Sequence, residues 1–324
     1  MLKTLSAAEL IKCAAEAPKW IVQDLIEDGD EVILAAAAKS RKTFLAIQLA
    51  LAIARGEPFL RWRVPRPLKT LYVNFELRDR VFGMRVLKLV GGPADASQCK
   101  NFTATQGLHR IDVLDAEQRQ ALAEDIARLD PAFIVWDVLA RMHAVDENQN
   151  MQMASVMQSI REASAGRAHL IVHHMRKAMP GENWNPGAQG MRGASAIHGE
   201  VDLVMGLHLR RGQGARYSVE FSARNVETPS ELLLDIDPAT QRFVEVGEAQ
   251  QRRHLRDRME AAFGPHPVLA VQKLHESLLA AQTMTPRRAQ QLIREAVQQG
   301  WLVRQGSGRN TEYRLLPASF PEAA

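Results

Sequence analysis

The sequence predicts an α/β fold with a mostly parallel central sheet, followed by a small C-terminal domain of winged helix-turn-helix type. Short apolar runs of strand type alternate with helical segments through most of the chain, which is the pattern of a parallel sheet with helices on both faces. The C-terminal part instead reads as three helices and a β hairpin. We place the larger domain at 1–248, with a helical segment at 1–19, the smaller domain at 250–318 and a tail at 319–324.

Each element of the larger domain has a local signal. Ser6 with Glu9 three positions later forms a capping pattern, so the N-terminus reads as a helix start rather than a signal peptide. Gly91-Gly92-Pro93 and Pro131 each end a helical pattern. The predicted strands are 31–34, 68–76, 133–137, 168–174, 201–209 and 217–223, and the predicted helices are 44–54, 79–90, 116–129 and 151–165.

Composition excludes several classes of protein. No apolar stretch reaches the roughly 18 residues that span a bilayer, so we expect no membrane association. Cys13 and Cys99 are the only cysteines, which argues against a disulfide framework and fits a reducing, cytoplasmic location. The net charge of +4 is uneven, because residues 251–317 carry eleven Lys and Arg against five Asp and Glu, a net +6. A polyanionic partner is therefore expected at the C-terminal domain.

The segment after the first strand resembles a phosphate-binding loop. Lys42 and Thr43 occupy the last two positions of the pattern G-x-x-x-x-G-K-[ST], while Ala36 and Arg41 occupy the two glycine positions. In such a loop, backbone N–H groups surround phosphate oxygens, the lysine reaches the β and γ phosphates, and the hydroxyl holds Mg²⁺. The alternative is a strand-to-helix turn that contains Lys-Thr by chance.

The missing glycines have opposite possible effects. Ala36 costs strain if its position needs a positive φ, and Arg41 places a side chain where the backbone must approach phosphate closely. Alternatively, the loop opens slightly and Arg41 adds a positive charge near the phosphates. These changes count against turnover more than against nucleotide binding.

Polar residues end three of the predicted strands. Glu76, Asp137 and the pair His173-His174 stand at the carboxyl ends, where sheets of this kind bind ligands. Asp137 follows four apolar strand residues and is placed to hold Mg²⁺ beside phosphates. Taken singly, each also fits a plain structural role in a loop, a helix cap or the core.

The order of these motifs resembles the RecA-like ATPases of the hexameric helicase type, and most closely the RepA-like replicative helicases of plasmids and mobile elements. The resemblance covers about Trp20 to Pro229. The segments that carry it are Lys39–Thr43, Val73–Glu76, Val135–Asp137, Asp146–Asn148, His173-His174 and Arg192–Ser195.

The resemblance implies ATP and Mg²⁺ as cofactors. Residues Lys39, Ser40, Arg41, Lys42 and Thr43 would bind the phosphates, and Thr43 with Asp137 would hold the metal. Glu76 would polarise the attacking water, and His174 would sense the γ phosphate or link it to the DNA-facing loop. Arg224 would be an arginine finger that reaches a neighbouring subunit, which requires a homo-oligomeric ring or filament. The segment 176–192 would contact DNA, or would be a simple connector.

The C-terminal domain reads as a winged helix. We predict helices at 252–263, 268–280 and 287–299, the last opened by Thr285 and Pro286, and then a hairpin from 300–304 to 311–315. A third helix of this kind enters the major groove of DNA. Many winged helices instead bind proteins or pack on their own ATPase core. The candidate DNA-binding residues are Arg287, Arg288, Gln291, Arg294, Arg304 and Arg309.

Three functions follow from these observations. The first is a DNA-associated ATPase of helicase or translocase type, partnered by DNA, by copies of itself and by replication or mobile-element proteins. The second is a DNA-binding regulator or loader whose nucleotide site does not turn over. The third is a subunit of a mobile-element or defence complex that uses nucleotide only to oligomerise.

Overall fold

A computed structural model describes residues 4–107, 110–147, 149–175, 197, 199–210, 217–281, 286–306 and 311–316. Within these ranges the side chains of residues 94–96, 248–254, 281, 287 and 288 are not described. The predicted segments 176–192 and 192–195, together with Asn148, Thr285 and Arg309, lie outside the described residues.

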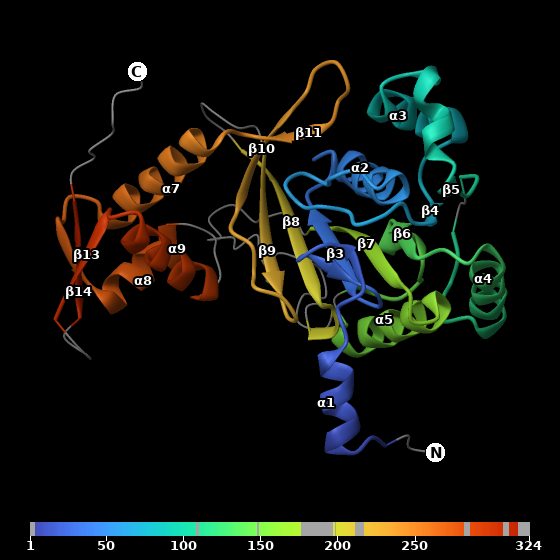
Figure 1. The fold of residues 1–324 in the computed structure, drawn as a ribbon, viewed down its shortest axis with the longest axis horizontal. Helices are drawn as coiled ribbons and strands as arrows, with labels where there is room; N and C mark the ends of the chain where they lie inside the picture. Colours follow the sequence, from blue (N-terminus) through green and yellow to red (C-terminus); the bar gives the residue numbers. More distant parts are fainter. Residues whose placement is uncertain are drawn as a thin grey trace.

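The centre of the molecule is a nine-stranded sheet with the order β11-β10-β9-β8-β3-β7-β6-β4-β5 (Figure 1). The run β8-β3-β7-β6-β4-β5 is parallel, and β9, β10 and β11 are added antiparallel at one side. This confirms the predicted mostly parallel sheet. In chain order the strands are β3 (Glu31–Ala36), β4 (Thr70–Asn74), β5 (Phe102–Ala104), β6 (Phe133–Asp137), β7 (Ala168–His174), β8 (Leu203–Leu209), β9 (Tyr217–Ala223), β10 (Leu232–Ile236) and β11 (Phe243–Glu245).

Helices cover both faces of the sheet. One face packs against α2 (Lys42–Arg55) and α3 (Asp79–Val90), and the other packs against α4 (Ala116–Leu129) and α5 (Asn150–Ser164) (Figure 1). Each face has its own apolar cluster, because alternate residues of a buried strand point to opposite sides. The helices at 79–90 and 116–129 and the strands at 133–137, 168–174 and 217–223 begin and end at the predicted residues.

The N-terminal segment is an isolated helix followed by a small hairpin. In α1 (Ala7–Ala15), Ser6 and Glu9 form the predicted capping box, and none of the helical residues is buried. Strands β1 (Trp20–Val22) and β2 (Ile26–Glu27), which sequence reasoning did not predict, pair antiparallel. Among the residues that the structure describes, none of the helices is long and apolar enough to cross a membrane.

The C-terminal part has an apolar cluster of its own. Helices α7 (Glu248–Phe263), α8 (Val271–Ala281) and α9 (Pro286–Gln298) pack with a three-stranded sheet of order β12-β14-β13. The predicted hairpin is present as β13 (Leu302–Gln305) and β14 (Glu312–Leu315). The prediction of helix at 268–270 was wrong, because β12 (Val268–Ala270) pairs with β14 before α8 begins.

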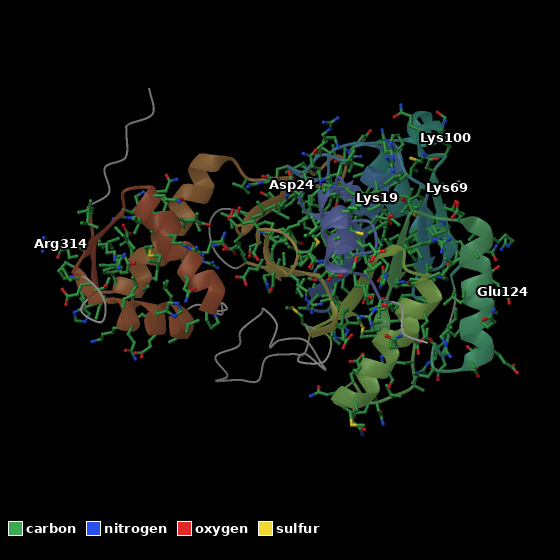
Figure 2. The ribbon with its side chains drawn as sticks, turned by 60° about the horizontal axis from the view of Figure 1, so that its bottom comes forward. Lys19, Asp24, Lys69, Lys100, Glu124 and Arg314 are labelled. Carbon is green, nitrogen blue, oxygen red and sulfur yellow. The ribbon has the colours of Figure 1, made fainter. Side chains whose placement is uncertain are left out.

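Charged side chains occupy the outer surface of the helices and the sheet edges. Figure 2 shows Glu124 on the outer side of α4, and Lys69 and Lys100 just before β4 and β5 begin. All three side chains are exposed. The apolar clusters of the two sheet faces therefore lie inside a charged surface, as expected for a globular α/β domain.

Candidate nucleotide site

The loop from β3 to α2 carries the predicted phosphate-binding residues. It follows the carboxyl end of β3, and Met175 N–H donates to the Ala36 carbonyl at 2.9 Å, which holds the end of β7 beside it. Within the loop, Ser40 closes a turn by donating from its hydroxyl to the Ala37 carbonyl at 2.7 Å. No side chain caps the first turn of α2, so the N–H groups of Lys42 and Thr43 are available for an anion, while Phe44 N–H donates to the Arg41 carbonyl at 2.9 Å.

The strained residues of the loop are only partly those considered from the sequence. Ala36 is the buried last residue of β3 and is not at positive φ, so the condition for strain at that position is not met. Arg41, at the second glycine position, has φ 66°, and Lys39 has φ 63°. A left-handed conformation costs a residue with a Cβ about 1–2 kcal/mol relative to glycine. The loop is therefore strained at Lys39 and Arg41 rather than at Ala36.

Lys42 lies buried in the first turn of α2, with an exposed fraction of 6%. Burial lowers the pKa of its ammonium group, and the negative charges of Asp137 and Glu76 oppose that change. Arg85 on α3 lowers the same pKa further by repulsion. A partly desolvated cation next to two carboxylates is a suitable partner for a phosphate group.

Asp137 is the buried carboxylate at the end of β6. The Tyr72 hydroxyl donates to Asp137 Oδ2 at 2.6 Å, while Oδ1 is buried without a hydrogen-bond partner of good geometry among the described residues. Burial raises the pKa of Asp137, and the hydroxyl groups of Tyr72 and Thr43 act in the opposite direction. A buried carboxylate oxygen without such a partner, together with the Thr43 hydroxyl that acts on the same carboxylate, fits the oxygen ligands that Mg²⁺ prefers. These two residues therefore fit the metal that was predicted for them.

Glu76 is held in a turn directly after β4. The buried amide of Asn74 closes this turn, because its Nδ2 donates to the Leu77 carbonyl at 2.6 Å and its Oδ1 accepts from Leu77 N–H at 3.0 Å. His174 Nε2 lies 3.9 Å from Glu76 Oε1, the distance of an ion pair rather than of a hydrogen bond. The His174 ring lowers the pKa of Glu76, and Lys42 adds to this effect against the cost of burial. Glu76 is therefore an ionised hydrogen-bond acceptor at neutral pH.

The structure brings most of the predicted site residues together at one edge of the sheet. Glu76, Asp137 and His174 end the neighbouring strands β4, β6 and β7, and Lys42 follows β3. His173, the other member of the pair, is fully buried in β7.

Arg224 lies at the opposite edge of the same sheet. It follows β9, whose last residue pairs with the first residue of β8. Its guanidinium donates to the Gly199 carbonyl and lies 3.8 Å from Asp202 Oδ1. The structure therefore does not bring Arg224 to the loop of its own chain.

The candidate DNA-binding residues fall on α9 and β13. The side chains of Arg294 and Arg304 are exposed. Gln291 instead donates from Nε2 to the Thr228 carbonyl at 3.2 Å, a contact with the larger domain. Arg287 and Arg288 lie in the first turn of α9, and their side chains are not described.

Sequence reasoning missed several residues that complete the site. Tyr72, Asn74 and Arg85 contact or influence the predicted residues, and Arg141 lowers the pKa of Glu76. Gln241, from the turn between β10 and β11, accepts a hydrogen bond from Arg41. The polar residues Tyr72 and Asn74 inside an otherwise apolar strand were the available signal for two of them.

Comparisons with known proteins agree with the observed fold. The structure aligns with a solved structure described as an ATPase domain, with a TM-score of 0.51 and 11% identity, over 67% of this chain and 85% of that chain. A KaiC-like protein PH0186 from the hyperthermophilic archaeon Pyrococcus horikoshii OT3 aligns with a TM-score of 0.48 and 13% identity, over 70% of this chain and 94% of that chain. At such low identity the first alignment supports the fold alone, and the second, with a TM-score below 0.5, adds nothing to it. None of the curated proteins is similar enough in sequence to count as a relative.

The α/β fold, with a mostly parallel sheet and the loop at the carboxyl ends of its strands, is the fold predicted from the sequence for a RecA-like P-loop core. The sequence of residues 1–179 matches the family described as AAA domain. Because this match covers more than half of the chain, the protein belongs to the AAA domain family.

Proposed function

We propose that the protein is a DNA-associated ATPase that binds MgATP at the loop after β3 and hydrolyses it. The observation that supports this function best is the arrangement around Lys42. One carboxylate, Asp137, is buried with an unfilled oxygen beside Thr43, and the second, Glu76, is ionised and held against His174. A metal-holding carboxylate and a water-orienting carboxylate next to a phosphate-binding lysine are the parts that phosphoryl transfer to water requires.

In the proposed reaction, Lys42 and the first-turn N–H groups of α2 bind the β and γ phosphates. Glu76 accepts a hydrogen bond from the attacking water and directs its lone pair at the γ phosphorus. Bond formation there is accompanied by cleavage of the bond to the bridging β–γ oxygen and by transfer of one water proton to the Glu76 carboxylate, which gives ADP and inorganic phosphate. His174 fixes the Glu76 carboxylate and connects it to the end of β7.

Thr43 and Asp137 would hold Mg²⁺, Asp137 through its buried Oδ1. The metal would supply neutralisation of the charge on the β and γ phosphates. Tyr72 positions the Asp137 carboxylate by donating to the other oxygen.

Arg224 supports the proposal of a homo-oligomer. Its exposed side chain, at the sheet edge opposite the loop, is unable to serve the site of its own chain. We propose that it reaches the nucleotide of a neighbouring copy, where a guanidinium stabilises charge developing in the transition state.

ATP turnover with and without single-stranded DNA tests the proposed function. We expect measurable turnover, faster with DNA, and a mass that increases when MgATP is added. Arg224→Ala is expected to reduce turnover without weakening MgATP binding. A protein that binds MgATP tightly, but turns over no faster than Glu76→Gln, is instead a non-hydrolysing regulator or loader.

We propose that the C-terminal part is a winged helix that binds duplex DNA through α9 and the β13–β14 hairpin. The exposed residues Arg294 and Arg304 and the net charge of +6 over 251–317 support this role. The contact of Gln291 with Thr228 supports the alternative in which this part packs on the ATPase core.

Arg294→Ala is expected to lower the affinity for duplex DNA and to reduce the slope of log K against log salt by about 1, because one phosphate contact releases about one counterion. Titration by fluorescence anisotropy at several salt concentrations measures this slope. Glu295→Gln is the matched control from the same helix, and we expect it to leave the slope unchanged or slightly increased. A slope unaltered by Arg294→Ala would mean that this guanidinium does not touch phosphate.

A further inference from the structure

The arginine that replaces a glycine in the phosphate loop makes a specific contact. Arg41 Nη1 donates to Gln241 Oε1 at 2.7 Å, a hydrogen bond between residues 200 positions apart. The guanidinium carbon also lies 5.3 Å from the centre of the Phe44 ring. Arg41 is therefore fixed at both its backbone, at the start of α2, and its side chain.

Gln241 is oriented for this contact by its own turn. Its Nε2 donates to the Pro238 carbonyl at 2.9 Å, which leaves Oε1 directed at Arg41. Its backbone N–H donates to the Asp237 carbonyl at 2.8 Å, and its φ is 60°. Gln241 at the tip of the hairpin and Arg41, its hydrogen-bond partner, therefore both have a left-handed backbone conformation. Strained conformations of this kind cluster at functional sites.

The β10–β11 hairpin that carries Gln241 is attached to the domain independently of Arg41. Phe243 N–H donates to Gln48 Oε1 at 2.7 Å, and Gln48 Nε2 donates to the Phe243 carbonyl at 2.9 Å, which joins β11 to α2 (Figure 1). Arg242 Nε donates to the Leu89 carbonyl at the end of α3, at 2.8 Å. Because the hairpin is hydrogen-bonded to both helices without the help of Arg41, it offers the Arg41 side chain an acceptor in a fixed position.

We propose that the β10–β11 hairpin positions the phosphate loop through the hydrogen bond between Arg41 and Gln241. A loop with glycine at this position reaches its left-handed conformation without strain and closes around phosphate by backbone freedom. Here a bulky residue occupies the position, and its side chain, held by the hairpin, fixes the direction of the strained backbone. Arg41 and Gln241 are in this respect positioning residues. The inference rests on the proposed binding of nucleotide.

A double substitution separates this role from direct contact with nucleotide. Gln241→Met keeps the length of the side chain and removes the acceptor, so we expect it to raise the Kd for MgATP about three- to tenfold, the loss of one hydrogen bond to a charged group in a partly exposed setting. In the background of Arg41→Gly, the same substitution is expected to have no effect, since no guanidinium remains to be positioned. Gln241→Glu keeps an acceptor and is expected to bind within about twofold of the wild type. Isothermal titration calorimetry measures the wild type and the four variants.

An equal loss of affinity from Gln241→Met in both backgrounds, or no loss in either, would overturn the inference. Hydrogen exchange of residues 37–43 without nucleotide gives a second readout, in which Gln241→Met is expected to speed exchange and Gln272→Met, a surface control on α8, is not. If the wild type binds no MgATP, the proposed function fails, and the exchange result alone then decides whether the hairpin positions the loop.

Discussion

Glu76→Gln is expected to lower the rate of ATP turnover about 10²–10⁴-fold, the usual contribution of a residue that handles the proton of the nucleophile. The structure predicts little change in MgATP affinity, because Glu76 lies beyond β4 and the phosphates are assigned to Lys42 and the start of α2. The amide keeps the shape of the side chain and removes its negative charge. Turnover is measured by phosphate release and affinity by calorimetry on the same samples.

Glu124→Gln makes the same chemical change on the exposed face of α4 and is the control. Equal turnover by Glu76→Gln and the control would remove Glu76 from the reaction.

Glu76 has a lowered pKa in the folded protein, so its contribution to stability is present above its unfolded pKa and is lost as the pH falls through the folded value. The variant is therefore expected to lose less stability than the wild type on acidification.

Lys42→Ala is expected to weaken MgATP binding by about 100-fold, or ~2.8 kcal/mol, because a buried ammonium that faces phosphate is replaced by a methyl group. The substitution also removes the buried cation whose charge Asp137 and Glu76 share, so a lower melting temperature is expected in the absence of nucleotide. Calorimetry gives the affinity. Thermal unfolding with and without MgATP shows whether the variant is folded and whether MgATP still raises its melting temperature.

Lys12→Ala on the exposed helix α1 is the matched control and is expected to bind MgATP as the wild type does. A folded Lys42→Ala protein with unchanged affinity would show that the loop is an ordinary strand-to-helix turn. The site of Asp137 and Glu76 would then need another explanation.

The local sequence pattern was sufficient to predict the parallel sheet and the residues at the carboxyl ends of its strands. Strand β6 is a run of apolar residues that ends in Asp137, and its short length between two helical patterns favours a buried strand. Helix α3 is bounded by Gly91, whose φ of 95° ends the helix as the sequence indicated. Where one short segment contains both the signal and its cause, the sequence is informative.

The missed features depend on contacts between distant segments. Strand β12 has residues that suit the start of a helix, and only pairing with β14 makes it a strand. Gln241 carries no local signal, since its role exists only where the hairpin meets Arg41. The positions of strain in the loop were also out of reach, because the φ of Lys39 depends on how the whole turn closes. The predicted winged helix, the domain limits and the role of Arg224 stay predictions.

The salt bridge between the two parts of the chain has a practical consequence. Arg258 Nη1 on α7 lies 2.5 Å from Glu231 Oε2, and the Glu231 side chain, at the start of β10, is only 1% exposed. A truncation that ends before α7 would remove Arg258 and leave the buried Glu231 carboxylate without its closest counter-ion. Breaking such a pair typically lowers the free energy of unfolding by about 3–5 kcal/mol. Residues 1–247 produced alone should accordingly melt at a lower temperature than the same residues in the whole polypeptide. Loss of activity in such a shortened protein would therefore reflect a loss of stability rather than a loss of DNA binding.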